Sequence, residues 1–229
     1  MTKFFGIGVG PGDSDLMTVK ATKAIKELDI LYTPIARKGM KSTALRIATP
    51  FVDDSLEIKE RKFPMTKDAD ERQKSWQLVA DEVIADVKSG KNVGMLTLGD
   101  PSVYSTFSYI QKLVESQIEI EIVAGISSFS QIAATLKQPL MLDEESLTVI
   151  PATKPTEVIS KFIDDNQNIV IMKISAKFDE IFDLLNQKSL LNNATIISNA
   201  SMENENIIQV SELTKQAEIP YFSTMIIKK

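Results

Sequence analysis

The stretch from 93 to 106, VGMLTLGDPSVYST, holds the residues of this chain whose types and spacing most clearly suit chemistry. It begins with apolar residues typical of a buried strand and then breaks at the turn sequence Gly-Asp-Pro-Ser at 99–102. A glycine in a turn that follows a buried strand lets a small molecule approach the backbone closely. We therefore expect a ligand site at this turn.

The chemistry of the same turn restricts the ligand. Gly94 and Gly99 have the outer spacing of a phosphate-binding loop, but Asp100 and Pro101 follow where that motif requires Lys and then Ser or Thr. A carboxylate repels phosphate and favours hydroxyl groups or positive charge, such as the ribose and ammonium groups of S-adenosylmethionine. An ordinary strand-to-helix turn in which Asp100 caps a helix is the alternative, and both interpretations stay open at this point.

Two further turns of small residues follow apolar segments. The turn at 10–13, Gly-Pro-Gly-Asp, ends a glycine-rich stretch that lacks the third glycine of a dinucleotide-binding fingerprint. The turn at 124–128, Ala-Gly-Ile-Ser-Ser, offers two hydroxyl groups. These hydroxyls can contact a ligand, or Ser127 can cap a helix over 128–136.

The composition excludes several classes of function. The 229 residues include no Cys and no His, so disulfides, thiolate nucleophiles, Cys or His metal sites and Ser-His-Asp triads are impossible. Catalysis is left to carboxylates, Lys, Tyr, hydroxyl groups, backbone amides or positioning. A net charge of −5 argues against a general nucleic-acid-binding protein. No apolar run reaches the length of a membrane span and the first residues lack a signal peptide's apolar core, so we expect a cytoplasmic protein.

Basic residues are concentrated in the first half of the chain. Residues 1–115 carry 17 Lys or Arg against 16 Asp or Glu, whereas residues 116–229 carry 9 against 15. A basic tract within the first half suits a polyanionic small substrate, and the alternative is a solvated surface neutralised by nearby acidic residues. The tract consists of Arg37, Lys38, Lys41, Arg46, Lys59, Arg61 and Lys62.

Apolar and amphipathic segments alternate along the whole chain, which is typical of α/β proteins. The pattern predicts two α/β domains, 1–115 and 116–229, with the last two strands antiparallel to the others. The predicted strands are 3–9, 29–33, 55–59, one beginning at 93, 119–123, 147–152, 168–174, 194–199, 207–210 and 222–228. The predicted helices are 16–28, 41–49, 69–89, 106–116, 128–136, 155–165 and 177–187.

Five blocks spread over the chain resemble the tetrapyrrole (corrin/porphyrin) methylases. They are GVGPGD at 8–13, LTLGDPSVYST at 96–106, VAGISSFS at 123–130, IVIMK at 169–173 and ISNAS at 197–201. Within that family, four blocks are similar to the precorrin-2 (or cobalt-factor II) C(20)-methyltransferases of cobalamin synthesis. These are YTPIARKGMKSTA at 32–44, FPMTKD at 63–68, the YST that follows GDP, and PYFS at 220–223.

The resemblance implies a fold, an assembly and a cofactor. It implies two α/β domains of the tetrapyrrole methylase, or class III methyltransferase, fold, a homodimer, and S-adenosylmethionine bound in a crevice between the domains. It also implies methylation of carbon 20 of a reduced tetrapyrrole. The cofactor contacts that the matching motifs imply are Pro11, Leu98, Gly99, Asp100, Val103, Ser127, Ser128, Met172, Ala200 and, as a weaker candidate, Thr224.

The sequence departs from the family pattern at a few positions. Ala124 stands where the family usually has Pro, and Ser127 stands where it often has Thr, which affects the expected backbone shape of that turn. The uroporphyrinogen methylases of the family carry an Asp after the second strand that serves as a base. This chain has Tyr-Thr-Pro at 32–34, so we do not expect their reaction.

The expected chemistry is methyl transfer from a sulfonium to an electron-rich carbon, which chiefly requires that the protein align two molecules and exclude water. We expect Arg37 or Lys38 to pair with carboxylates of the tetrapyrrole, because a guanidinium matches a carboxylate in shape and charge. Tyr104 and Tyr32 are both open as proton acceptors, and no catalytic residue is assigned.

Two other functions fit the same sequence. A methylase of the same fold can act on another tetrapyrrole position or on a different substrate, such as diphthamide or ribosomal RNA, although the acidic composition disfavours RNA. A non-catalytic S-adenosylmethionine-binding module would bind the cofactor and show no turnover with any tetrapyrrole.

Overall fold

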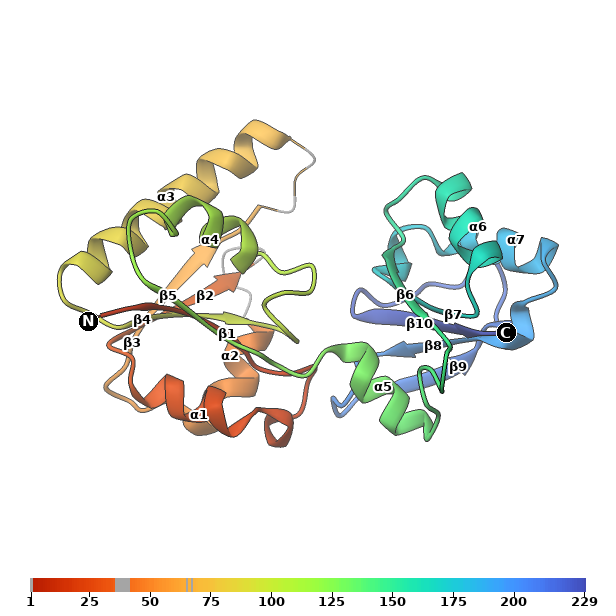
Figure 1. Ribbon diagram of the computed structural model, residues 1–229, viewed down its shortest axis with the longest axis horizontal. Coiled ribbons are helices and arrows are strands. Elements are labelled where there is room, and N and C mark those ends of the chain that lie inside the picture. The colour runs from red at the N-terminus through yellow and green to blue at the C-terminus, as the bar shows by residue number, and fades with distance from the viewer. Residues whose placement is uncertain (1, 36–41, 65, 67) are drawn as a thin grey trace. The chain divides into compact units, whose positions relative to one another are not determined.

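The computed structural model describes residues 2–35, 42–64, 66 and 68–229, and it divides the chain into two compact units, Met1–Ser127 and Ser128–Lys229. Each unit contains one five-stranded sheet with helices on its faces (Figure 1). The predicted fold class, two α/β domains, is therefore confirmed.

The first unit is built on a parallel sheet with the strand order β3-β2-β4-β1-β5. The central strands β1 and β4 are buried along their whole length, because helices cover both faces of the sheet. The strands are β1 (Phe4–Gly8), β2 (Ile30–Ile35), β3 (Glu57–Lys62), β4 (Val93–Thr97) and β5 (Ile120–Val123).

Two pairs of helices cover this sheet. Helices α1 (Val19–Lys26) and α2 (Thr43–Ala48) share an apolar cluster with one face, and α3 (Ala69–Lys88) and α4 (Phe107–Val114) share a second cluster with the other (Figure 1). Helix α1 begins later than predicted because 14–16 form a 3-10 turn and Thr18 caps the helix instead. Two 3-10 segments complete the unit, η1 (Ser14–Leu16) and η2 (Thr49–Phe51).

Strand β5 explains where the first unit ends. We predicted a domain boundary at 115/116, whereas the structure divides the chain after Ser127. The reason is that β5 pairs in parallel with β1, from Phe4 opposite Ile120 to Ile7 opposite Val123. A strand that supplies the edge of the first sheet cannot belong to the second unit.

The second unit contains a mixed sheet with the strand order β6-β7-β10-β8-β9. The last strand, β10, lies in the middle and runs antiparallel to both neighbours, as predicted for its direction. Helices α6 and α7 cover one face of this sheet and α5 packs on the other (Figure 1). The elements are α5 (Ser128–Leu136), β6 (Leu147–Pro151), α6 (Thr156–Asp165), β7 (Asn168–Met172), η3 (Ile174–Ala176), α7 (Phe178–Gln187), η4 (Leu191–Asn193), β8 (Ala194–Ser198), β9 (Asn206–Gln209), η5 (Val210–Glu212) and β10 (Ser223–Lys228).

No helix in the described part of the chain combines the length and the apolar character that crossing a bilayer requires.

Candidate functional site

The turns after β1 and β4 lie side by side at one edge of the first sheet, because these two parallel strands are neighbours. Gly10 and Gly99 form an isolated antiparallel bridge: the Gly99 amide donates to the Gly10 carbonyl at 2.8 Å and the Gly10 amide donates to the Gly99 carbonyl at 3.3 Å. Both glycines have positive φ, +76° and +73°, which a side chain would disfavour. The glycines of the two motifs are thus required by the backbone.

The turn after β5 joins the other two through backbone contact. A Cβ added to Gly125 would lie 2.1 Å from the Gly99 carbonyl oxygen, and one added to Gly8 would lie 2.6 Å from the Gly125 amide nitrogen. A Cβ added to Gly99, in contrast, would meet a single described atom within 4 Å, the Ile126 carbonyl oxygen at 3.9 Å. The three turns therefore pack backbone against backbone and leave open space beside Gly99.

Asp100 links these turns through its carboxylate. One carboxylate oxygen accepts the Gly125 amide at 2.9 Å, and the other accepts the Ser102 amide at 2.8 Å and the Ser102 hydroxyl. Burial alone would raise the pKa of Asp100, but the hydrogen bonds from Ser102 and Gly125 outweigh burial and hold the pKa below its ordinary value. Asp100 is therefore ionised at neutral pH and holds two turns together, but it does not cap the helix that follows, because the N-cap of α4 is Thr106.

The cofactor contacts predicted in the first unit lie in these three turns. Pro11 is buried next to the Gly10–Gly99 bridge, and Leu98 and Val103, both partly buried, flank Asp100 in the second turn. Ser127 follows Gly125 and is the last residue of the unit. The structure thus brings the predicted first-unit residues together around one set of backbone contacts.

The cofactor contacts predicted in the second unit also lie together. Met172 ends β7 directly opposite Thr224 of β10, and the Ser128 and Thr224 hydroxyl oxygens are 3.5 Å apart. Ala200 follows β8, which is the other neighbour of β10. Met172 and Ala200 also contact the apolar cluster under α5, so both contribute to the core as well as to this edge of the sheet.

Two residues of the basic tract are neutralised within the first unit. Lys59 pairs with Asp86 at 2.7 Å and Arg61 pairs with Glu82 at 2.6 Å, both across β3 and α3. These pairs support the alternative of a neutralised surface for this part of the tract. Arg37 and Lys38, the predicted substrate contacts, lie outside the described residues, as does Lys41.

The two candidate proton acceptors differ in their surroundings. Tyr32 is 1% exposed, its hydroxyl donates to Asp86 at 2.6 Å, and burial together with that carboxylate raises its pKa strongly. A phenol that is buried and already donates its hydrogen bond to a carboxylate is out of reach of a ligand proton, so we interpret Tyr32 as structural. Tyr104 is 46% exposed and has a φ of +48°, and partial burial raises its pKa. Both phenols are therefore neutral at neutral pH.

Several residues at the edge of the second sheet escaped the sequence-based predictions. Lys173 directly follows β7, and Asn199 and Ser201 lie in the turn after β8; their φ angles are positive, +58°, +53° and +58°. Left-handed non-glycine residues are strained and concentrate at functional sites. The αL tolerance of Asn is the one signal that could have indicated such a turn; Lys and Ser carry none.

Comparison with known proteins agrees with the fold and the motifs. The family Tetrapyrrole (Corrin/Porphyrin) Methylases matches residues 3–214. A cobalt-precorrin-2 C(20)-methyltransferase of Salmonella typhimurium is 36% identical over 99% of this chain and 96% of its own length. A probable cobalt-precorrin-2 C(20)-methyltransferase of Methanocaldococcus jannaschii is 35% identical with the same coverage. A precorrin-2 C(20)-methyltransferase of a Sinorhizobium species is 25% identical over 98% of this chain and 94% of its own length.

Solved structures show the same fold at lower sequence identity. A cobalt precorrin-4 methyltransferase of cobalamin biosynthesis superposes with a TM-score of 0.75 at 18% identity and covers 99% of this chain and 94% of its own. A uroporphyrin-III C-methyltransferase from Thermus thermophilus, complexed with S-adenosylhomocysteine, gives a TM-score of 0.73 at 16% identity over 99% and 97% of the two chains. With the family match over most of its length, the chain belongs to the tetrapyrrole (corrin/porphyrin) methylases.

Proposed function

We propose that this protein is an S-adenosylmethionine-dependent methyltransferase that methylates carbon 20 of precorrin-2 in cobalamin biosynthesis, with the cobalt complex as its preferred substrate. The observation that carries the proposal is the similarity to two relatives named for cobalt-precorrin-2, at 36% and 35% identity over 99% of this chain. The relative named for precorrin-2 without cobalt is 25% identical. The chain's own sequence blocks at 32–44 and 220–223 favour the same reaction.

The residues present suit S-adenosylmethionine, which supplies a methyl group already activated on a sulfonium. The open space beside Gly99 allows close approach to the backbone, and the ionised Asp100 provides negative charge for a ligand with hydroxyl groups and an ammonium group. We propose that Pro11, Leu98 and Val103 line this region. In the second unit we propose contacts from Ser128, Met172, Ala200 and Thr224, and Ser127 completes the set.

The protein's contribution to the reaction is positioning and exclusion of water. The backbone contacts among Gly8, Gly99 and Gly125 fix three turns without any mobile side chain at the contact. Fixed turns hold a donor in one orientation, and alignment of two reactants is the main requirement for transfer from an activated donor. Because the Tyr32 hydroxyl is buried and donates a hydrogen bond to Asp86, no step is assigned to it.

The substrate side of the proposal rests on charge. Reduced tetrapyrroles carry many carboxylates, and Lys59 and Arg61 are already paired with Asp86 and Glu82. We therefore keep Arg37 and Lys38 as the proposed substrate contacts within the basic tract. The family resemblance further leads us to propose that the protein is a homodimer and is located in the cytoplasm. Light scattering on the purified protein tests the dimer, for which we expect a mass of twice 25.4 kDa.

The decisive experiment is incubation of the purified protein with S-adenosylmethionine and either precorrin-2 or cobalt-precorrin-2 under anaerobic conditions. We expect one added methyl group by mass spectrometry, located at carbon 20 by NMR with a labelled methyl donor. We also expect the higher kcat/KM with the cobalt complex. Methylation at another carbon, or binding of S-adenosylhomocysteine without turnover on either substrate, would contradict the proposal.

A further inference from the structure

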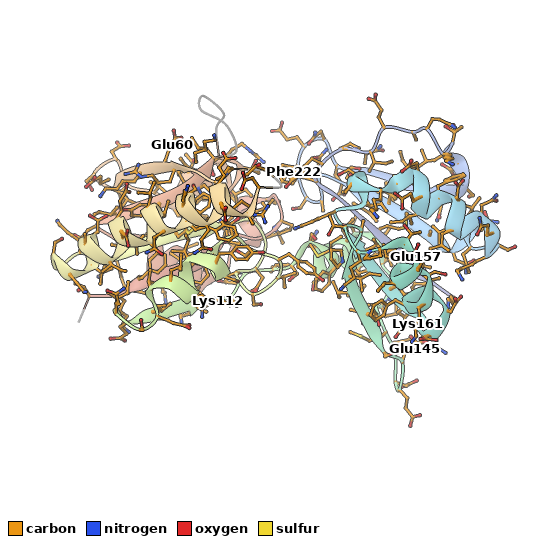
Figure 2. All side chains as sticks on the ribbon, turned by 90° about the horizontal axis from the view of Figure 1, so that it is seen from above. Glu60, Lys112, Glu145, Glu157, Lys161 and Phe222 are labelled. Atoms are coloured by element: carbon orange, nitrogen blue, oxygen red, sulfur yellow. The ribbon has the colours of Figure 1, made fainter. Side chains whose placement is uncertain are left out.

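Two adjacent aromatic side chains lie exposed at one edge of the second sheet. Tyr221 and Phe222 are 61% and 38% exposed, and their rings form an edge-to-face pair with centroids 5.1 Å apart and an interplanar angle of 74°. Large apolar side chains that stay exposed next to each other commonly mark a binding surface. Figure 2 labels Phe222 at the border of the second unit, well away from Lys161 on α6.

The turn that carries these aromatic residues is fixed by hydrogen bonds. The Asn199 backbone amide donates to the Phe222 carbonyl at 2.7 Å, and the Ser223 hydroxyl donates to the Pro220 carbonyl at 2.6 Å. The Ser198 hydroxyl lies 2.7 Å from the Ser223 hydroxyl, and both residues are buried. Since the Ser223 proton is already used, Ser198 is the donor of this pair. The aromatic pair is thus held on a rigid support.

The antiparallel direction of β10 decides what surrounds the pair. Because β10 begins where β7 and β8 end, Tyr221 and Phe222 lie at the same edge as Met172, which stands opposite Thr224. The residue directly after β7 is Lys173, an exposed cation with a φ of +58°. The edge therefore combines two aromatic rings with a positive charge beside the residues proposed for the cofactor.

We propose that Tyr221, Phe222 and Lys173 form a tetrapyrrole-recognition surface of the second unit. In this arrangement the aromatic pair packs against the macrocycle and the Lys173 ammonium pairs with one of its carboxylates. Two rings at 74° cannot both lie flat on a small planar group such as adenine, but they can contact the face and the rim of a large ring. The inference rests on the proposed function for the identity of the ligand.

Binding is measured separately from turnover to test this surface. Full-length protein is titrated anaerobically with cobalt-precorrin-2 in the presence of S-adenosylhomocysteine, and bound ligand is followed by its absorbance. We expect Tyr221→Ala to raise the tetrapyrrole Kd about tenfold, a typical scale for loss of an aromatic contact. Tyr221→Phe keeps the ring and should bind like the wild type.

Lys173 is tested with a substitution that preserves its backbone. Asn tolerates the left-handed region, so Lys173→Asn removes the cation while keeping the turn, and we expect a roughly fivefold higher tetrapyrrole Kd that converges with the wild type at high salt. Lys161→Gln, on α6, and Ile207→Ala, an exposed apolar residue of β9, are the matched controls and should leave the Kd unchanged.

The outcomes separate this inference from the proposed function. Unchanged tetrapyrrole affinity in both Tyr221→Ala and Lys173→Asn would overturn the surface, even if the wild type methylates normally. A larger effect on the Kd of S-adenosylhomocysteine than on that of the tetrapyrrole would also overturn it, because the aromatic pair would then belong to the cofactor. Wild-type protein that binds cobalt-precorrin-2 through these residues without methylating it would support the surface and contradict the proposed reaction.

Discussion

Replacement of Asp100 tests whether one carboxylate holds the turns of the first unit together. Asp100→Ala removes the oxygen that accepts the Gly125 amide and the one oxygen that accepts both bonds from Ser102, whereas Asp100→Asn keeps one oxygen and replaces the other with a donor. If the amide group of Asn faces Gly125, two donors meet; if it faces Ser102, the local turn is lost. Both variants should therefore destabilise the first unit, the alanine variant more.

The expected loss of stability follows from the three hydrogen bonds that the Asp100 carboxylate accepts. The bond to Gly125 spans 25 residues in sequence and is partly buried, and a hydrogen bond to a charged group of this kind contributes about 1.5–3 kcal/mol. The bonds to Ser102 are local and exposed, so solvent reduces their contribution to roughly 0.5 kcal/mol together. We expect Asp100→Ala to lower the free energy of unfolding by about 2–3 kcal/mol and Asp100→Asn by about 1–2 kcal/mol.

The assay is urea unfolding of the ligand-free protein followed by fluorescence of Trp76, the only Trp in the sequence. Trp76 lies on α3, so its signal reports on the first unit. Asp54→Asn is the charge-matched control: among the described residues this exposed carboxylate has no hydrogen-bond or ion-pair partner, and its substitution should leave unfolding unchanged.

The pH dependence gives a second, independent check. Because the folded pKa of Asp100 is below its ordinary value of about 3.9, its contribution to stability is fully present above that value and is lost as pH falls through the folded pKa. The stability difference between the wild type and Asp100→Asn should therefore be largest near neutral pH and shrink in acid. A difference that stays constant from about pH 7 to pH 3, or an Asp100→Ala variant within about 0.5 kcal/mol of the wild type, would refute the reasoning.

Two further predictions concern packing in the first unit, measured by the same Trp76 unfolding. Gly125→Ala should destabilise it by about 3 kcal/mol and weaken S-adenosylhomocysteine binding in calorimetry, because the new Cβ would meet backbone at 2.1 Å. Gly90 has a φ of +92°, and an added Cβ would meet nothing within 4 Å among the described residues, so Gly90→Ala should lower the free energy of unfolding by only about 1 kcal/mol. Equal losses of stability in the two variants would show that the close backbone contact at Gly125 is not the cause. Thr33→Val should stabilise the protein by about 1–2 kcal/mol, because the buried Thr33 hydroxyl has no hydrogen-bond partner in the described part of the chain. A destabilised valine variant would show that this hydroxyl is satisfied in solution.

Hydrophobic periodicity and turn residues in the sequence predict most of the helices and strands of this fold. The helix at 128–136 was predicted with the bounds that the structure shows, and the long helix at 69–89 is α3. Both carry apolar residues at helical spacing over several turns, which is the strongest local signal in a sequence. The ends of the elements were predicted less exactly. The helix predicted to begin at residue 16 begins at Val19, because Thr18 caps it.

The site shows the same division between local and non-local information. The sequence by itself determined the three glycine-bearing turns, the absence of thiolate and imidazole chemistry, and the family, because these depend on residue types and short spacings. Only the tertiary structure decided that β5 belongs to the first unit, that Asp100 accepts the Gly125 amide, that Tyr32 is buried against Asp86, and that Tyr221 and Phe222 lie at the same edge of the second sheet as Lys173. Each of these depends on which strands become neighbours, and strand order joins residues whose distance along the chain carries no local signal.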